Sequence, residues 1–233
     1  MNTTTSVRST PSTRTIGLPV RAPQEISTYG LSRALLEIAA RTCTALLLGL
    51  FAYFAIVNWR ADPGRITLLL IVVAECVTVG LSLFARTPVR RDWSPFAFVC
   101  SICGTYYFLA VQLAPGVRLV PEAVGATLQI VGICWQIFAK ATLRASFGLL
   151  PANRGIVCGG PYRFMRHPIY FGYFVADIGF LLTNFGTWNL VVYIVQFVLQ
   201  IGRIVREEWL LSTDGEYRAY MARVRFRVIP GLF

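Results

Sequence analysis

Long apolar stretches separated by short polar connections dominate the chain after residue 30. A helix needs about 20 predominantly apolar residues to cross the hydrocarbon core of a bilayer. We predict a membrane-spanning helix for each of six stretches: 35–57, 66–85, 96–115, 120–143, 168–183 and 187–204. Because little separates the last two stretches, they are expected to form a helical hairpin. The pattern predicts an all-α integral membrane protein with about six spans.

Basic residues fall almost entirely on one side of this predicted topology. If the N-terminus lies in the cytoplasm, 19 of the 22 Lys and Arg residues fall in the cytoplasmic segments 1–41, 86–92, 140–166 and 203–233. The other three lie in the outer loops. Cytoplasmic loops of membrane proteins are enriched in Lys and Arg, so both termini are predicted to be cytoplasmic.

Composition supports the same class of protein. Hydrophobic residues make up 55% of the chain and charged residues only 14%, whereas a soluble domain carries about 25% charged residues. The net charge of +11 would suggest nucleic acid for a soluble protein. Here it reflects the basic loops, so we expect no nucleic-acid partner. Five of the six cysteines lie in apolar stretches and no histidine cluster joins them, so we expect no metal site.

The first 30 residues are rich in Ser, Thr, Pro and Arg, with Glu25 as their only acid. No apolar segment follows the basic residues within this tail, which argues against a secretory signal. We expect a flexible cytoplasmic tail, with a transit peptide as the alternative. The compact chain and its short loops favour a bacterial inner membrane, and an endoplasmic reticulum-like membrane is the alternative.

Two acids, Glu75 and Asp177, lie inside the apolar stretches. A carboxylate at the centre of a membrane helix costs about 2.5–3.5 kcal/mol on insertion scales, so each should face the interior of the bundle. Asp177 shares a helix face with Tyr170, Tyr173 and Phe174. Hydrogen bonding between helices is the structural interpretation of both acids, and a role in the functional site is the alternative for Asp177.

A second polar feature lies on the last predicted span. Gln196, Gln200, Arg203 and Glu207 recur at helical spacing and form one polar stripe on an otherwise apolar helix. A stripe that faced lipid would be costly, so we expect it to line a cavity or to contact another helix. Arg203 and Glu207 are four residues apart, and an ion pair within the helix is the simpler interpretation of these two.

The segment 151–170, PANRGIVCGGPYRFMRHPIY, concentrates the groups that carry chemistry. It holds three glycines, three prolines, three arginines, two tyrosines and the single histidine of the chain, and it is longer than a connector requires. Pro168 is suited to the first turn of the fifth helix, whose N-terminal N–H groups can bind an anion. For His167, an ordinary helix cap is the alternative.

Two separated motifs resemble those of one family. The run from Gly160 to Gly172, GPYRFMRHPIYFG, resembles the GxYxxxRHPxYxG signature of membrane methyltransferases. Arg206-Glu207-Glu208, the YRAY sequence at 217–220 and Ile229-Pro230 resemble the carboxyl-terminal pattern of the same proteins. On these motifs, over about residues 120–233, the chain resembles the isoprenylcysteine carboxyl methyltransferase family, which is related to the phospholipid N-methyltransferases.

The resemblance implies transfer of a methyl group from S-adenosylmethionine at the cytoplasmic membrane face. It also implies a cofactor pocket formed by the 144–170 loop and the C-terminal helix. The chain then divides into a tail (1–30), N-terminal transmembrane helices (31–119) and a methyltransferase core (120–233). By position, the implied cofactor contacts are Arg154, Gly155, Ile156, Val157, Tyr162, His167, Pro168, Ile169, Tyr170 and Glu207.

The same comparison implies roles in catalysis and in substrate binding. Arg166 and one of the pair Glu207 and Glu208 match residues implicated in catalysis, and Arg203 matches an arginine that faces the substrate. Together with the polar stripe, the predicted substrate-binding residues are Arg203, Gln200, Gln196 and Asp177. The family often carries histidine at the position of Arg154, which is a departure from its pattern.

Elementary chemistry agrees with these roles and leaves the methyl acceptor open. A carboxylate is already ionised at neutral pH and needs only a cation to hold it, either Arg166 or Arg203. An amine needs a base to take its proton, either Glu207 or Glu208. We expect the carboxylate of an isoprenylcysteine-like lipid as acceptor, with a phospholipid amine or a small thiol as alternatives. The alternative that is not an enzyme is a small transporter, in which the buried polar residues would form a path across the membrane.

Overall fold

The computed structural model describes residues 28–83, 90–91, 94–143, 152–153 and 157–232. The chain divides into two compact units, Met1–Ala39 and Ala40–Phe233. The predicted tail, 1–30, falls almost entirely outside the described residues, so its expected flexibility stays a prediction. The contacts described below all lie within the second unit.

The described chain is helical, as the apolar pattern predicts, apart from one short antiparallel pair of strands, β1 and β2. In this pair Arg90 lies opposite Asn153 and Arg91 lies opposite Ala152. The elements in order are α1 (Thr28–Ala61), α2 (Thr67–Leu83), β1 (Arg90–Arg91), α3 (Pro95–Tyr106), the 3-10 helix η1 (Tyr107–Ala110), α4 (Glu122–Leu143), β2 (Ala152–Asn153), the 3-10 helix η3 (Gly160–Arg163), α5 (Pro168–Thr183), α6 (Thr187–Leu211) and α7 (Gly215–Arg223).

Each of the six predicted spans corresponds to a helix, but the helices differ in length. Among the described residues, three helical stretches are long and apolar enough to cross a membrane: Ile38–Ala61, Glu122–Leu143 and Thr187–Leu211. Three shorter apolar helices, Thr67–Thr78, Pro95–Ala110 and Pro168–Thr183, lie between them in the sequence. The chain is therefore a membrane protein, while the count of six crossings and the cytoplasmic termini stay predictions.

The third predicted helix is wrong at its C-terminal end. Ser94 caps α3 by accepting a hydrogen bond from the backbone of Ala97. Helix α3 ends at Tyr106 and is followed by η1, which ends at Ala110, so the helical stretch does not reach residue 115. Asn189 of α6 explains this end because its side chain accepts from the Gln112 N–H at 2.8 Å and donates to the Gln112 carbonyl at 3.1 Å. These two bonds replace the helical hydrogen bonds that Gln112 would otherwise make.

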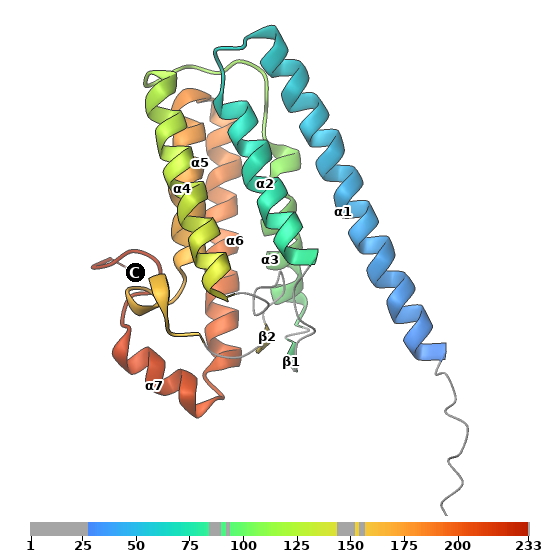
Figure 1. Cartoon of the computed structure of the whole chain (residues 1–233), viewed down its shortest axis with the longest axis vertical. Helices are drawn as coiled ribbons and strands as arrows, with labels where there is room; N and C mark the ends of the chain where they lie inside the picture. Colours follow the sequence, from blue (N-terminus) through green and yellow to red (C-terminus); the bar gives the residue numbers. More distant parts are fainter. Residues whose placement is uncertain (1–27, 84–89, 92–93, 144–151, 154–156, 233) are drawn as a thin grey trace, which may run out of the picture. The chain divides into compact units, whose positions relative to one another are not determined.

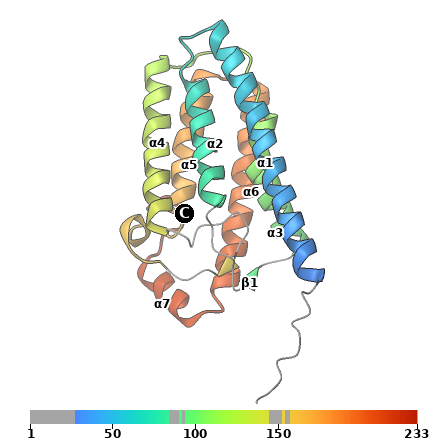
Figure 2. The ribbon, with the colours of Figure 1, turned by 45° about the vertical axis from the view of Figure 1, so that its right-hand side comes forward.

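Close packing of α4 against α5 forms the centre of the bundle, and Figures 1 and 2 show these helices running side by side. Gly125 and Gly132 of α4 face Gly179 and Gly172 of α5. A Cβ atom on Gly132 would lie 2.6 Å from the Gly172 carbonyl oxygen, and one on Gly179 would lie 2.6 Å from the Gly125 carbonyl oxygen. Small residues let helix backbones approach closely, which is a common mode of association in membranes.

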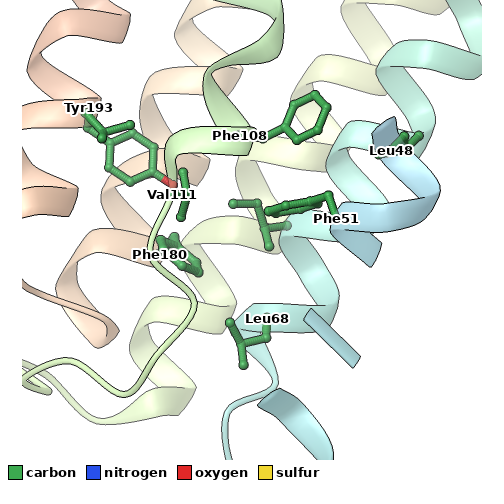
Figure 3. Close-up of a cluster of buried hydrophobic side chains, with 9 residues drawn as sticks. Leu48, Phe51, Leu68, Phe108, Val111, Phe180 and Tyr193 are labelled. Atoms are coloured by element: carbon green, nitrogen blue, oxygen red, sulfur yellow. The ribbon is translucent and has the colours of Figure 1, made fainter. Parts of the chain in front are cut away.

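An apolar cluster joins helices from both halves of the chain. The rings of Phe51 in α1 and Phe108 in η1 pack edge to face at 5.0 Å between centroids, as Figure 3 shows. Phe180 of α5 and Tyr193 of α6 complete the contact between the halves. The full set of buried members is Leu48, Phe51, Leu68, Ile71, Phe108, Val111, Phe180, Val192 and Tyr193.

Two basic residues that the sequence places in loops are buried inside the bundle. Lys140, counted in a cytoplasmic loop, lies in α4 at 1% exposure and donates to Thr78 at 2.8 Å. Arg65, counted in an outer loop, is 2% exposed and donates to Asn184 at 2.6 Å. Lys140 is thus in a helix and not in a loop, whereas Arg65 does lie in the connection between α1 and α2, as predicted, with its side chain buried. A polar partner on another element lets each cation leave water.

Candidate functional site

The two motifs singled out in the sequence meet at one end of the bundle. Figures 1 and 2 show α7 at the end where α4 finishes and α5 begins. There the segment from η3 to the start of α5 carries Arg166 and His167, and the last turns of α6 carry Glu207 and Glu208. Helix α5 starts at Pro168, as predicted, with His167 at its N-cap position.

The carboxylate of Glu208 is the common acceptor of this site. It is buried, and it accepts from Arg166 Nε at 2.7 Å and from Arg227 Nε at 2.8 Å. The ring Nε2 of His167 lies 3.2 Å from the same carboxylate. We call these four residues the Glu208 cluster. Two guanidinium groups and an imidazole compensate the cost of removing one carboxylate from water, so the Glu208 cluster is a stable buried charge.

Backbone hydrogen bonds fix the C-terminal segment to the start of α5. The Arg166 N–H donates to the Phe226 carbonyl at 2.9 Å, and the His167 N–H donates to the Arg227 carbonyl at 2.7 Å. Nη1 of Arg166 also donates to the carbonyls of Val224 and Arg225 at 2.9 and 3.0 Å. Arg166 therefore connects α6 to the C-terminal segment, and its guanidinium group is occupied by structural bonds.

A tyrosine-rich cluster packs beside the Glu208 cluster. The Tyr220 hydroxyl of α7 donates to the Tyr162 carbonyl of η3 at 2.6 Å, and Tyr217 packs in the same group. Burial raises the pKa of Tyr162 well above its ordinary value, and Glu207 raises it further. Burial also raises the pKa of Tyr217, again with Glu207 as the next cause. These phenols therefore stay protonated, and Glu207 lies within electrostatic range of both.

The two adjacent glutamates have different environments. Glu208 is saturated by the donors of its cluster, whereas Glu207 is half-buried and faces the tyrosines. No hydrogen bond to Glu207 exists from the residues that the structure describes, and the buried Tyr162 hydroxyl likewise lacks a partner among them. Two polar groups of this kind, close together, can bind a ligand with hydrogen-bond donors and positive charge.

Gly160, the first residue of η3, must be a glycine. Its φ is +57°, in the left-handed region, and a Cβ atom would lie 2.9 Å from the Thr142 hydroxyl of α4. This left-handed conformation starts η3, where the next two residues, Pro161 and Tyr162, are buried. The glycine thus positions Tyr162 against α7.

The polar stripe of α6 points inward, as predicted. Gln196, Gln200 and Arg203 are at most 9% exposed, and a Cβ atom on Gly104 of α3 would meet Arg203 Cδ at 3.6 Å. The stripe therefore contacts α3. The Arg203 guanidinium lies 5.7 Å from the centre of the Tyr170 ring, which is a cation–π contact. The expected ion pair between Arg203 and Glu207 stays a prediction.

Three of the predicted cofactor contacts, Arg154, Gly155 and Ile156, lie outside the described residues. Val157 packs at the edge of the tyrosine cluster. Pro168 and Ile169 are buried at the start of α5, where the Pro168 carbonyl accepts from the Trp135 indole at 3.0 Å. Their placement beside His167 is compatible with the predicted role, which stays a prediction.

Asp177 lies apart from the Glu208 cluster. It is ten residues, or about 15 Å of helix, along α5 from His167. Oδ1 of Asp177 lies 3.1 Å from the Tyr107 hydroxyl of η1. The structure thus places Asp177 away from His167, and hydrogen bonding between helices, the structural interpretation, describes this contact. Its role in substrate binding stays a prediction.

Sequence reasoning missed Arg227, the third donor to Glu208. A signal was present, because arginines alternate with apolar residues over 223–228, and such alternation is typical of an extended segment with one buried face. In the structure Val224 and Val228 are buried but Phe226, between them, is 39% exposed, so the alternation holds only in part. The pattern predicts an extended segment, but it does not identify Glu208 as the partner.

A protein-family model matches part of the chain. The model of the isoprenylcysteine carboxyl methyltransferase (ICMT) family matches residues 126–213, which run from α4 to the end of α6. The match includes Arg166, His167, Glu207 and Glu208 and ends before Arg227. No curated protein matches the chain.

Proposed function

Since residues 126–213 belong to the ICMT family, a family of methyltransferases, we propose that this protein transfers a methyl group from S-adenosylmethionine to a lipophilic acceptor. The acceptor that we propose is the carboxylate of an isoprenylcysteine-like lipid. The reaction takes place at the predicted cytoplasmic face of the membrane, where a lipid can enter from the bilayer and a polar cofactor from the cytosol.

The observation that carries the proposal is the meeting of the two family motifs. His167 and Glu208 are 41 residues apart in the chain, yet their side chains lie 3.2 Å apart. This contact brings Glu207, the neighbour of Glu208, to the tyrosines of η3 and α5. An acid, several aromatic rings and buried arginines thus converge on one end of the bundle.

The residues at this end fit the cofactor. When bound, S-adenosylmethionine supplies a methyl group on a positively charged sulfonium. Glu207 and the faces of Tyr162 and Tyr170 would hold the positive charges of such a molecule. The buried Tyr162 hydroxyl, which lacks a partner among the described residues, would gain a hydrogen bond to a polar group of the cofactor.

Arg203 is the residue that we assign to the acceptor carboxylate. Arg166 already donates to Glu208 and to two backbone carbonyls, so it is a positioning residue. Arg203 lies four residues before Glu207 on α6, next to the Tyr170 ring. Its guanidinium group can hold a carboxylate by two parallel hydrogen bonds and orient one oxygen for attack.

An amine acceptor is the second candidate, and the environment of Glu207 favours it. An amine must lose a proton when it is methylated, and Glu207 is the acid that is not saturated by arginine at this site. In that case Glu207 would accept the proton. A thiol acceptor would need the same assistance.

The direct test is incubation of the purified protein with labelled S-adenosylmethionine and a total lipid extract. Identification of the product distinguishes the acceptors, because a methyl ester is hydrolysed by mild base whereas a methylated amine or thioether is not. We expect a base-labile lipid product. The absence of any methylated lipid or thiol, together with no binding of S-adenosylmethionine, would refute the proposal.

Variants test the roles that we assign to Glu207 and Arg203. Glu207→Gln should abolish transfer and weaken cofactor binding while the protein stays folded. Arg203→Lys should raise KM for a carboxylate acceptor, because lysine cannot make the two parallel bonds. Glu216→Gln, an exposed acid on α7, is the matched control and should leave both quantities unchanged. Wild-type turnover in Glu207→Gln contradicts the assignment.

A further inference from the structure

A second group of buried polar residues lies in the middle of the helices, away from the Glu208 cluster. Glu75 of α2 and Asp177 of α5 are each 6% exposed. The Tyr107 hydroxyl oxygen lies between them, 3.1 Å from Glu75 Oε1 and 3.1 Å from Asp177 Oδ1. We call Glu75, Tyr107 and Asp177 the central carboxyl pair with its bridging tyrosine.

Counting protons shows that Tyr107 cannot form a hydrogen bond with both carboxyl groups while both are ionised. A tyrosine hydroxyl has one hydrogen to donate, and an ionised carboxylate can only accept. If both acids were ionised, one of the two contacts with Tyr107 would join two oxygen atoms with no hydrogen between them. Both contacts become hydrogen bonds only when one acid carries a proton and donates it to the tyrosine oxygen.

Of the two acids, Glu75 is the one with a cationic neighbour. Lys140 of α4 donates from Nζ to Thr78 at 2.8 Å and to Gln136 at 3.2 Å. Thr78 lies one turn after Glu75 on the same face of α2, so the ammonium group lies within electrostatic range of Glu75. A buried ammonium group requires a counter-charge, and Glu75 provides it.

The surroundings of Asp177 favour its neutral form. Its second oxygen, Oδ2, has no hydrogen-bond partner among the described residues, and the same holds for the nearby Tyr193 hydroxyl. Tyr193 is 1% exposed, and its ring packs 5.8 Å from that of Tyr107. An ionised carboxylate with an unsatisfied oxygen is costly in such a place, whereas a protonated acid carries no net charge.

We propose that the central carboxyl pair is a proton-binding site: Asp177 holds one proton and donates it to Tyr107, which donates to a charged Glu75 that balances Lys140. With this single proton the buried group is electrically neutral. It joins α2, η1, α4 and α5, of which α2 and η1 precede the segment matched by the ICMT family. The inference is independent of the proposed methyl transfer.

Infrared spectroscopy of the full-length protein in lipid nanodiscs at neutral pH tests the proton directly. The wild type should show the carbonyl band of a protonated carboxylic acid, and Asp177→Asn should lack it. Persistence of the band in Asp177→Asn, or its absence from the wild type, would overturn the proposal. Loss of the wild-type band on addition of sodium chloride would also overturn it, because the site would then bind a metal cation.

Thermal unfolding supplies an independent test that needs no band assignment. Asparagine can donate to Tyr107 as a protonated acid does, so Asp177→Asn should keep the wild-type unfolding temperature within about 2 °C. Glu75→Gln removes the counter-charge of Lys140 and should lower the unfolding temperature by about 6–10 °C. The double variant Glu75→Gln/Lys140→Met should recover most of this loss. Equal losses in the two single variants, or a double variant no better than Glu75→Gln, would contradict the assignment of the proton to Asp177.

Discussion

The Glu208 cluster and the central carboxyl pair satisfy buried carboxyl groups in two different ways. At the end of the bundle, one carboxylate accepts from Arg166, His167 and Arg227. In the middle of the helices, two carboxyl groups share one tyrosine hydroxyl, with a single lysine nearby. The first arrangement has an excess of cationic donors over acids. The second has more acids than cations.

The contrast shows how the position of a buried carboxyl group in the bundle determines which groups can stabilise it. Arginine side chains reach Glu208 from the C-terminal segment and from the loop before α5, and Arg227 remains 38% exposed to water. Among the residues that the structure describes, the hydrogen-bond partner of Glu75 and Asp177 is instead the Tyr107 hydroxyl of η1. Cations therefore stabilise the peripheral carboxylate, and a proton and one lysine stabilise the central pair.

The largest loss in the free energy of unfolding should come from Glu208→Gln. The substitution leaves Arg166 buried without its counter-charge and weakens the attachment of the C-terminal segment. We expect a loss of about 3–5 kcal/mol in the free energy of unfolding, measured by denaturation in detergent, and a loss of methyl transfer through misplacement of His167. A variant as stable as the Glu216→Gln control would show that the Glu208 cluster does not hold the site together.

Removal of the hydroxyl between the central acids should have the next largest effect. Tyr107→Phe leaves both carboxyl groups without their shared partner, and we expect a loss of about 1–3 kcal/mol in unfolding free energy. Tyr193→Phe is the matched control, because the Tyr193 hydroxyl has no partner among the described residues and its removal should be nearly neutral. If the two substitutions cost the same, the hydrogen bonds of Tyr107 do not stabilise the pair.

A smaller effect is expected for Arg227→Ala. Its side chain is partly exposed, and Glu208 keeps Arg166 and His167 as donors. The expected loss is about 1 kcal/mol, seen as earlier proteolysis of the C-terminal segment. Arg225→Ala is the control, because among the described interactions only its backbone carbonyl takes part. A cost near that of Glu208→Gln would instead make Arg227 the principal partner of the carboxylate.

The smallest effect should come from the exposed ion pair of Arg118 and Asp62. Their atoms lie 2.6 Å apart, which is closer than the Arg166–Glu208 contact, yet both side chains are nearly half exposed. Arg118→Gln should change the unfolding free energy by less than about 1 kcal/mol, and added salt should reduce even this change. A larger cost would show that distance matters more than burial in this protein.

Much of the fold could be predicted from the sequence, because apolar stretches of the right length leave the backbone few options in a membrane. The hairpin of α5 and α6 and the start of α5 at Pro168 are confirmed. The predicted end of the third helix and the loop position of Lys140 are wrong. In each case the deciding contact comes from a distant residue, such as Asn189 for α3, which local periodicity does not reveal.

For the candidate site, the sequence predicted the participants better than their roles. It indicated that His167 and the two glutamates belong together, and the contact between His167 and Glu208 agrees with this. It did not distinguish Glu207 from Glu208. Adjacent residues on a helix point about 100° apart, so packing against η3 and the C-terminal segment decides which acid is saturated.

By itself, the sequence indicated a helical membrane protein whose motifs resemble those of a methyltransferase family, because hydropathy and short motifs are local properties of the chain. Only the tertiary structure decided that Arg227 completes the Glu208 cluster and that Tyr107 joins Glu75 to Asp177. The physical reason is that the charge state of a buried acid depends on the donors that surround it in space. Those donors come from distant parts of the chain.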